Sequence, residues 1–596
     1  MTPLNFHNPT SISTPQLARN SSTNFTPPRT LILFTILLTI AILALRITAP
    51  SDIHDQTQPK TIAYTVNIAL HPTDWKRWIL PLENDQYPAT KPPLYNWLAV
   101  PFVALTRGHY EWPHKIPSII AFLLLGSLII TTLRRIEFLS PIRFSTTPYL
   151  GFIIFAANYM FVKLSYLARP DTILTLFLIL GWIAATQLVI NNNQSTNNEN
   201  LKSIQRPLQF IFWLSIALAM LAKGPVAVLI LFYLFFLIWI LPDPNLNTNQ
   251  SNTNQHPILH RLHPRRIIKT ITRAARLSGA AWGIPLAILP FALWFFLAWT
   301  INPDHVYGTL IRKEIVDRIL GLGSDPASTH SPWEFLITLP AMPASFFARF
   351  LPWSIFFLAA LLDLFGRKRP DRIRGLPEPS TSNNNTQSLT NTDNHTAALR
   401  IWLISSIIST IIPIAFFSLS IGKRGDYIAA SFIPASMLIA YWANHLGLQL
   451  AVIKPKLFPI IATVTVAALG LSAFSYNLPA KYPLGSELWN FARKVRPVID
   501  DNKNPLPVSF YRTGRTPIQT VLYRSQSDTP DAVKQLTQSN KPFHLIIRAK
   551  YLDEFNQQPW IKNWTKKEIV RSTPTPGDPN SKPYQVFLYT LTPLPK

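Results

Sequence analysis

The chain has 596 residues, and 55 Lys and Arg against 29 Asp and Glu give it a formal net charge of +26. Charged residues make up 14%, well below the roughly 25% of a typical soluble domain, and there is no cysteine. This composition excludes intrinsic disorder for most of the chain, a disulfide scaffold, a cysteine nucleophile and a thiolate metal site. Because the apolar residues come in long blocks, the basic surplus indicates membrane-flanking loops and anionic headgroups rather than nucleic acid. An integral membrane protein is predicted.

The apolar blocks predict an α-helical polytopic fold of about eleven spans, and up to roughly thirteen where proline divides a block. A membrane helix needs about 20 mostly apolar residues. The expected spans lie near 30–50, 116–133, 147–163, 172–190, 208–222, 225–241, 280–300, 349–365, 400–419, 428–443 and 457–476. The first span follows a polar arm, residues 1–29, and lacks a small-residue cleavage site, so we expect an anchor rather than a removed signal peptide.

The Lys and Arg residues near the span ends predict the orientation. They gather in the loops 134–143, 202–206, 261–276 and 367–374, which are therefore assigned to the cytoplasm together with the arm. The opposite loops are 51–115, 164–171, the turn near 223, 301–348 and 420–427. We expect a multi-pass protein of the plasma (inner) membrane whose chemically suggestive groups lie on the outer side.

After residue 479 the pattern changes to short β-like runs that alternate with helix-like segments. Strands are expected at Val508–Tyr511, Phe543–Arg548, Glu568–Arg571 and Tyr584–Thr590, and helices at Ser486–Arg496 and Pro530–Gln538. This predicts three regions: the arm 1–29, a membrane region 30–479 with the first outer loop 51–115, and a soluble α/β domain 480–596. An odd number of spans from a cytoplasmic start places that domain outside the cytoplasm.

Asp52, Asp55 and Lys91 are the candidates in the first outer loop. Residues 61–70 have one apolar face, as in a helix lying along the membrane interface. Lys91 precedes two prolines that fix the backbone beside a cation at headgroup level. An ordinary connector with surface charges remains the alternative for the two aspartates.

The remaining candidates lie in the other outer loops. Ionisable groups at membrane depth are functional candidates by default, although a weak surface ion pair, an interfacial anchor or a structural i,i+4 pair would explain single members. The members are Arg169 and Asp171, Lys223, Glu314 and Arg318, and the group Lys423, Arg424 and Tyr427.

Among these outer groups, two carboxylates and five or six cations are expected to converge beside long apolar helices. A carboxylate suits a general base, and cations with a phenol suit a phosphate or its leaving group, because they neutralise and hydrogen-bond its oxygens. The arrangement therefore predicts a reaction that needs a base and a departing phosphate.

The ordered motifs resemble a known superfamily. Asp-Trp (from Asp74), Lys-Pro-Pro-Leu (from Lys91), Ala-Arg-x-Asp, Lys-Gly-Pro, Glu-x-x-x-Arg, His-x-x-Trp, Leu-Pro-Trp and Lys-Arg-x-x-Tyr follow one another over about residues 30–445. This order resembles the membrane GT-C glycosyltransferases of the dolichyl-phosphate-mannose mannosyltransferase and aminoarabinose (lipid A) transferase type. The resemblance implies an acidic base in the first outer loop, carrier-phosphate contacts from Lys91, Lys423 and Tyr427, and Asp171 as a second acidic position.

Two positions depart from the family pattern. The family has an acidic pair about sixteen residues before the Asp-Trp aspartate, and counting back from Asp74 reaches Gln58. The carboxylate would then come from Asp55 through a three-residue shift, or from Asp52. The residue before Lys91 is Thr90 where family members often have Glu, which weighs against a metal site, so no cofactor is expected.

The resemblance implies transfer of a sugar from a polyprenyl-phosphate carrier to a lipid, glycan or protein acceptor at the outer face. Asp55, or Asp52, would act as base, while Lys91, Lys423, Arg424 and Tyr427 stabilise the phosphate. The alternative is a lipid or solute transporter whose pathway these charges line. Inverted repeats and charges at mid-membrane typify transporters, and the sequence shows neither.

Overall fold

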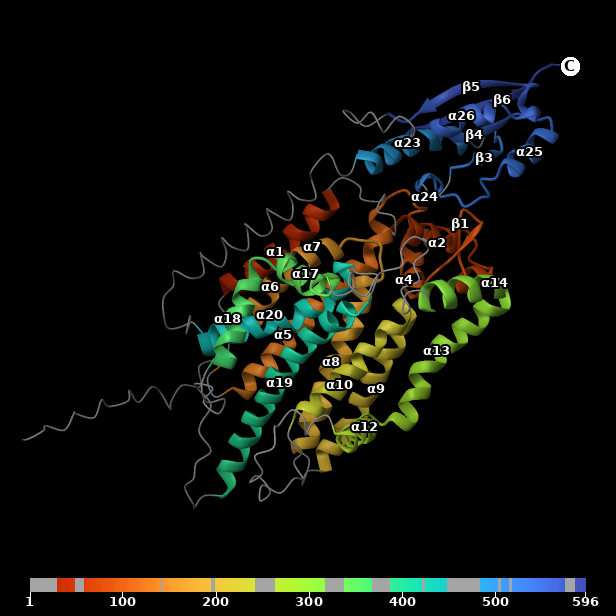
Figure 1. Ribbon diagram of the computed structural model, residues 1–596. Coiled ribbons are helices and arrows are strands. Elements are labelled where there is room, and N and C mark those ends of the chain that lie inside the picture. Colours follow the sequence, from red (N-terminus) through yellow and green to blue (C-terminus); the bar gives the residue numbers. More distant parts are fainter. Residues whose placement is uncertain are drawn as a thin grey trace, which may run out of the picture.

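The computed structural model describes twelve stretches of the chain. They are residues 29–48, 58–140, 143–194, 199–241, 263–316, 337–366, 386–420, 424–447, 483–501, 505–513, 517–573 and 585–595. A helical bundle forms most of the molecule, and a four-stranded sheet with its own helices lies at one end of it (Figure 1). This agrees with the predicted mostly helical fold.

The bundle and its loops contain the following elements in chain order. They are α1 (Arg29–Thr48), α2 (Gln58–Leu70), α3 (Trp75–Ile79), β1 (Leu82–Glu83), β2 (Tyr87–Pro88), α4 (Leu94–Leu105), η1 (Trp112–Lys115), α5 (Ile116–Leu139), α6 (Thr147–Ala156), α7 (Tyr159–Leu164), α8 (Asp171–Gln194), α9 (Glu199–Lys223), η3 (Gly224–Ala227), α10 (Val228–Ile240), α12 (Pro264–Ser278), α13 (Ala280–Ile301), α14 (Pro303–His305), η5 (Val306–Val316), α17 (Ala341–Arg349), α18 (Trp353–Gly366), α19 (Thr386–Ser418), η6 (Gly425–Ser431), α20 (Phe432–Trp442) and η7 (Ala443–Gly447).

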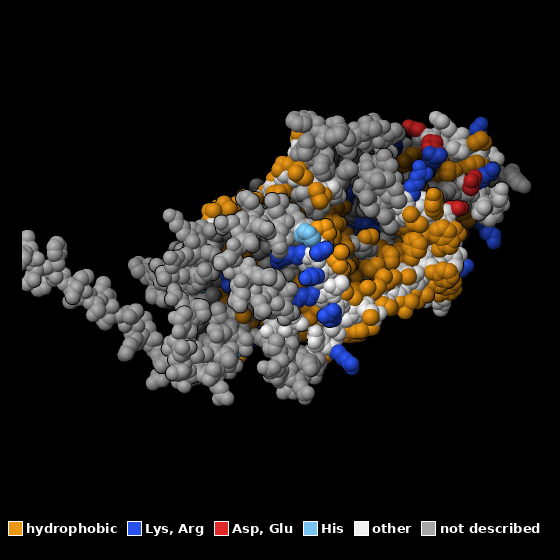
Figure 2. Space-filling model, turned by 60° about the horizontal axis from the view of Figure 1, so that its bottom comes forward, with side chains coloured by type: hydrophobic (Ala, Val, Ile, Leu, Met, Phe, Trp, Pro, Cys, Tyr) orange, Lys and Arg blue, Asp and Glu red, His pale blue; other side chains and the backbone are white. Residues whose placement is uncertain are grey.

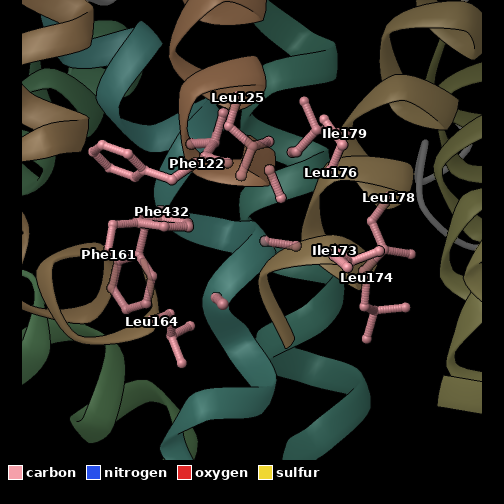
Figure 3. Close-up of a cluster of buried hydrophobic side chains, with 14 of the residues drawn as sticks. Phe122, Leu125, Phe161, Leu164, Ile173, Leu174, Leu176, Leu178, Ile179 and Phe432 are labelled. Atoms are coloured by element: carbon pink, nitrogen blue, oxygen red, sulfur yellow. The ribbon is translucent and has the colours of Figure 1, made fainter. Parts of the chain in front are cut away.

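The core of the bundle lies around α5, α7, α8 and α20, whose apolar side chains meet in Figure 3. Phe122 of α5 stacks on Phe155 of α6 with ring centroids 5.2 Å apart. Helix α8 is buried along most of its length, and its Trp182 indole donates to Ser405 Oγ of α19 at 2.8 Å. A polar contact of this kind fixes which faces of two apolar helices meet, since apolar packing alone is less directional.

Five helical segments of the described chain are long and apolar enough to cross a membrane, and a sixth is if the bent pair α17–α18 counts as one span. The five are Trp112–Leu139, Asp171–Asn193, Gln205–Ile240, Ala280–Ile301 and His395–Ser418. The third contains both α9 and α10, which the sequence predicts as two spans. These segments support a multi-pass membrane protein.

Some predicted spans differ from the helices. The expected span 147–163 is two short helices, because Asn158 has extended backbone and its side chain accepts from Met160 N to begin α7. The expected span 349–365 falls on α17 and α18, which are bent by 112°. The predicted span 457–476 lies outside the described residues.

The described part of the first outer loop, residues 58–115, is an ordered layer. The predicted helix within 61–70 is confirmed as α2, which is mostly buried. Trp97 of α4 donates to Trp78 O at 2.7 Å, and Trp294 of α13 donates to Ile79 O at 3.0 Å. Asn67 Oδ1 of α2 accepts from Leu82 N at 3.0 Å, which ties the β1–β2 hairpin to α2.

The C-terminal segment forms a sheet of order β3-β4-β6-β5, in which β3 and β4 are parallel and the other pairs antiparallel. Its elements are α23 (Pro483–Ile499), β3 (Val508–Tyr511), α24 (Ile518–Val521), α25 (Pro530–Gln538), β4 (Phe543–Arg548), η9 (Ala549–Tyr551), α26 (Leu552–Asn556), η10 (Pro559–Ile561), β5 (Trp564–Arg571) and β6 (Val586–Pro593). The ranges predicted for β3, β4 and α25 match, whereas β5 begins earlier, and β6 begins and ends later, than the sequence predicts. All six residues of β4 are buried, as expected for a central strand covered on both faces.

This sheet layer docks on the first outer loop through polar contacts that we call the docking seam. Ser525 Oγ accepts from Asn67 Nδ2 at 3.1 Å and from Asp85 N at 3.2 Å. Arg496 of α23 donates to Gly108 O at 2.9 Å. Gly108 has φ +59°, and a Cβ there would lie 2.5 Å from the Tyr523 ring, so glycine allows the two layers to touch.

Candidate functional site

Six charged side chains from distant segments meet at the end of the bundle next to the first outer loop. We call them the ion cluster; its members are Lys163, Arg169, Asp171, Lys223, Arg349 and Asp426. They come from α7, the turn before α8, α8 itself, α9, α17 and η6. The chain spacing between α7 and η6 exceeds 250 residues, so the cluster exists only in the folded chain.

Asp171 is the first residue of α8, where the positive end of the helix dipole favours a carboxylate. Its Oδ1 pairs with Lys223 Nζ, and its Oδ2 lies 3.2 Å from Arg169 Nε. Lys223 is the last residue of α9, where the negative helix end favours a cation. The Asp171 side chain is only 4% exposed. Both carboxylate oxygens of Asp171 therefore contact a cation.

The turn at Lys223 positions that cation. Gly224 adopts φ +73°, a conformation that glycine tolerates and that most residues do not. The chain then passes through η3 into α10. Lys223 Nζ also lies 4.7 Å from the centre of the Tyr427 ring, within the range of a cation–π contact. Tyr427 in turn packs on Phe417 at 5.0 Å.

Asp426 is the second carboxylate of the cluster. Its Oδ1 accepts from Arg349 at 2.7 Å and lies 3.5 Å from Lys163 Nζ, while its Oδ2 accepts from Arg169 at 3.0 Å. Burial by itself would raise the pKa of Asp426, but the cations of Lys163 and Arg169 outweigh it and lower the pKa below its usual value. Arg169 thus bridges the two carboxylates.

Gly425 makes room for one of these pairs. A Cβ at this position would lie 2.4 Å from Cζ of Arg349. The guanidinium therefore occupies the space that any other residue at position 425 would fill. The contact between Arg349 and Asp426 depends on this glycine.

The first outer loop reaches the cluster through Lys91 and Gln58. The ammonium of Lys91 contributes a favourable electrostatic interaction with Asp171. Gln58 is fully buried at the start of α2, and its Oε1 accepts from Ala168 N at 2.9 Å, three residues before Asp171. Tyr95 of α4 donates to His114 O at 2.9 Å and contacts Ser118, which holds α4 against α5.

The structure brings together four of the residues predicted from the sequence, Arg169, Asp171, Lys223 and Tyr427, and places Lys91 within electrostatic range. Arg424 is exposed at the boundary before η6. Glu314 is a residue of η5. Asp52, Asp55, Arg318 and Lys423 lie outside the described residues.

Sequence reasoning missed three members of the cluster: Lys163, Arg349 and Asp426. Lys163 and Arg349 stand in apolar helices, and only the folded chain shows their common partner. Asp426 is adjacent to Tyr427 in a motif already chosen for its cations. The carboxylate of Asp426 between a glycine and a tyrosine was the available signal, since an acidic residue at the end of an apolar helix is costly unless it is paired.

The cluster holds four cations against two carboxylates, so it keeps an excess of positive charge in a mostly buried place. Such a site favours an anionic ligand, and arginine forks suit phosphate oxygens. Both carboxylates lie at ion-pair distance from these cations, which suits them to hold the cationic side chains in position. Within the described stretches, no group of three or more His, Asp or Glu side chains is arranged to hold a metal ion.

The apolar helices, the ordered layer 58–115 and the docked sheet indicate a multi-pass helical membrane protein with an additional α/β layer. No protein-family model and no curated protein matches the chain. Among solved structures, ArnT from Cupriavidus metallidurans bound to undecaprenyl phosphate is similar, with a TM-score of 0.60 and 13% sequence identity over 94% of this chain and 97% of that one.

The same protein in the apo state gives a TM-score of 0.59 at 14% identity over the same shares of both chains. The archaeal oligosaccharyltransferase AglB from Archaeoglobus fulgidus, in complex with an inhibitory peptide and a dolichol-phosphate, covers 88% of this chain and 70% of its own with a TM-score of 0.41 at 12% identity. The similarity to AglB is too weak to support a conclusion about this chain. The match to ArnT shows that the chain has the GT-C fold, which confirms the resemblance at the level of the fold.

Proposed function

We propose that the chain is a membrane glycosyltransferase that transfers a sugar from a polyprenyl-phosphate carrier to a hydroxyl or phosphate group of a lipid, glycan or protein acceptor. The observation that carries the proposal is the fold, which follows over nearly the whole chain that of a protein crystallised with undecaprenyl phosphate. The positively charged ion cluster supports it, because a phosphodiester donor needs cations beside apolar helices.

The reaction is a single displacement. An acceptor oxygen attacks the anomeric carbon, its proton passes to a carboxylate, and the bond between that carbon and the phosphate oxygen breaks. The products are the glycosylated acceptor and the polyprenyl phosphate, and the anomeric centre is inverted. A positioned base of this kind contributes about 10²–10⁴ in rate.

Asp55 is the proposed base, with Asp52 as the second candidate. Gln58, which contacts the turn before Asp171, follows Asp55 by three residues in the sequence. The amide of Gln58 cannot accept a proton at neutral pH, so it does not replace a carboxylate. Asp171, with each oxygen on a cation, orients the acceptor through Arg169 and Lys223 instead of taking the proton.

Lys91, Lys423, Arg424 and Tyr427 are the proposed contacts of the carrier phosphate. The leaving phosphate gains negative charge as the bond breaks, so these contacts strengthen in the transition state and raise the rate. Arg169 and Lys223 add positive potential from the cluster. Glu314 and Arg318, four residues apart, are proposed to pair and to shape the donor entrance.

The test is transfer by the purified full chain in detergent, with a polyprenyl-phosphate sugar compared with a soluble nucleotide sugar. We expect transfer from the lipid-linked donor alone. Lys91→Ala should lower both carrier affinity and turnover by about tenfold or more, since one charge-assisted contact to phosphate is removed. Lys534→Ala, an exposed lysine of α25, is the matched control and should leave both unchanged.

Efficient transfer from the nucleotide sugar alone, insensitive to Lys91→Ala, would refute the carrier. If the purified chain transfers no sugar but mediates uptake of a lipid or solute into vesicles, the result would favour the transporter alternative. Asp55→Asn should lower turnover by about 10²–10⁴-fold while carrier binding persists. If Asp55→Asn is fully active and Asp52→Asn is not, Asp52 is the base.

We also propose that the ion cluster and the α/β domain 480–596 face the outside of the plasma (inner) membrane. The absence of cysteine gives a direct test, because a single introduced thiol is then the only one. Gln538→Cys in α25 should react with a membrane-impermeant maleimide in intact cells, whereas Thr272→Cys in α12 should react only after lysis. Both positions are exposed, and the reverse pattern would overturn the orientation.

A further inference from the structure

At the end of the bundle opposite the ion cluster, α9 and the start of α13 line an open groove of about 580 Å³. Arg206, Pro207, Phe210 and Trp282 line it. The volume falls within the range of roughly 300–1,000 Å³ that small-ligand sites occupy. Phe210 and Trp282 are 47% and 41% exposed, so an aromatic wall faces outward on a helix pair that lies in the membrane.

The groove is rigidly built. Gly279 ends α12 with φ +65° and lets the chain turn into α13. Gln209 of α9 donates to Leu277 O at 2.8 Å, and Trp213 donates to Ser278 O at 2.7 Å. The last two residues of α12, directly before Gly279, therefore accept hydrogen bonds from α9, and Trp282 follows Gly279 by less than one helical turn.

Helix α12, which leads directly into α13, supplies positive charge near the groove. Its five cations occupy an arc of about 100° of the helix circumference, and Ile268 and Ile271 lie outside that arc, about 60° and about 120° beyond its edge. The cations are Arg265, Arg266, Lys269, Arg273 and Arg276. Ile268 is 60% and Ile271 52% exposed although both are apolar. Figure 2, in which the bottom of the molecule comes forward, shows Lys and Arg side chains gathered beside a hydrophobic surface.

This pattern is that of a helix lying in the plane of a membrane interface, with apolar side chains toward the acyl chains and cations toward the headgroups. Within the stretches that the structure describes, Arg206, Arg265, Lys269 and Arg276 have no carboxylate partner. Their charge is therefore available to an anionic headgroup.

We propose that the groove between α9 and α13 is a binding site for an anionic phospholipid of the membrane leaflet at this end of the bundle. The phosphate lies against Arg206 with α12 adding positive potential, and an acyl chain lies along Phe210 and Trp282. A tryptophan at the level of the headgroups and a cation above an apolar groove are the two features that such a lipid recognises. A zwitterionic lipid gains the apolar contacts without the charge, so it binds less tightly. The site is independent of the proposed transfer reaction.

The test is native mass spectrometry of the full chain in detergent, titrated with phosphatidylglycerol or with phosphatidylcholine of the same acyl chains. We expect phosphatidylglycerol to be retained preferentially. Arg206→Gln should weaken it about fivefold, the effect of one cation near an anionic lipid, and leave phosphatidylcholine unchanged. Arg135→Gln removes an exposed arginine of α5 outside the groove and should change nothing.

Phe210→Ala, which widens the groove without altering charge, should weaken both lipids and so tests the acyl-chain wall separately. Thermal unfolding of each variant checks that it is folded. Equal retention of the two lipids by the wild-type chain would overturn the proposal. So would equal losses in Arg206→Gln and Arg135→Gln, because the attraction would then be general and not a site.

Discussion

Arg169 is the residue on which the ion cluster depends, because it contacts both carboxylates. Each oxygen of Asp171 and Asp426 then has a cationic partner. Removing one partner of a buried pair leaves the other charge uncompensated, which costs more than the pair itself contributes. The cluster should therefore respond strongly to single substitutions that keep shape and remove charge.

Asp426→Asn is expected to destabilise the protein by about 3–5 kcal/mol and to lower transfer, because Lys163, Arg169 and Arg349 lose their common carboxylate. The measurement is the unfolding midpoint in detergent together with the transfer rate. Asp531→Asn, an exposed aspartate of α25, should leave both unchanged. A wild-type midpoint in Asp426→Asn would show that the pairs add nothing to stability.

The pH dependence of the same pair follows from the lowered pKa of Asp426. A carboxyl whose folded pKa lies below its unfolded value, about 3.9, stabilises the folded state fully above that value and loses this contribution as the pH falls through the folded pKa. The difference in unfolding free energy between wild type and Asp426→Asn should therefore be constant from pH 8 to about 5. It should shrink below about pH 4, and a difference that already shrinks near pH 6 would contradict the assignment.

Gly425→Ala tests the position of one guanidinium without touching a charge. The new Cβ would displace Arg349 from Asp426, so we expect a loss of transfer activity with a smaller change in stability than Asp426→Asn causes. Gly308→Ala is the matched control, since none of the residues that the structure describes lies within 4 Å of its added Cβ. Equal activity in the two variants would exclude a role for the Arg349 contact.

At the scale of the elements, the sequence pattern predicted correctly those helices and strands whose ends are determined by neighbouring residues. The strands β3 and β4 and the helix α25 match their predicted ranges because apolar runs and flanking turn residues specify them without distant partners. The division of 147–163 was not predicted, since a single Asn158 inside an apolar block breaks the helix only through its own side-chain cap. The hydrogen bond from Met160 N to the Asn158 side chain has no counterpart in a hydropathy profile.

The candidate site was predicted only in part, because some of its residues are marked by their neighbours in the sequence and others are identified only by distant partners. Arg169, Asp171 and Lys223 stand at helix ends in polar tripeptides, which the sequence shows directly. Lys163 and Arg349 are single cations in apolar helices, and their partner Asp426 is 263 and 77 residues away along the chain. Pairings over such separations follow from tertiary packing, and the local pattern of a single sequence contains no record of them.

Glu137 connects three elements at the other end of α5. It is fully buried, its Oε2 accepts from Phe144 N at 2.8 Å, and its Oε1 lies 2.7 Å from His445 Nε2. Glu137→Ala should therefore destabilise the protein by about 1–3 kcal/mol, because a backbone donor and an imidazole lose their partner.

A double-mutant cycle with His445→Ala separates these effects. The two substitutions should be non-additive in unfolding free energy, since each removes the same contact. Additive losses would show that Glu137 acts through Phe144 N alone.

At the scale of the whole molecule, the docking seam joins the sheet layer to the loop that carries Lys91 and Gln58. Arg496 is only 8% exposed and donates to Gly108 O from α23. A change in the sheet layer therefore reaches the first outer loop directly.

Arg496→Ala should speed hydrogen exchange around Gly108 and in α24, because the guanidinium also donates to Val521 O there. Exchange in α8 should be unchanged. Arg493→Ala, an exposed neighbour on α23 that bonds only Asn490 in the described part of the chain, is the control. Faster exchange in both variants alike would mean that α23 frays as a whole and that the seam has no special part in it.

Among the described strands, the order leaves β5 at one edge of the C-terminal sheet, and no described strand pairs with its outer side. An open edge can recruit the same edge of another copy, and copies confined to one membrane meet often. β5 carries Lys566, Lys567, Glu568 and Arg571, and its pairing with β6 is interrupted between Glu568 and Val570. Charge along the strand and a break in its register both oppose strand addition. The edge is thus protected against sheet-to-sheet self-association, and the protein can crowd in the membrane without polymerising through this layer.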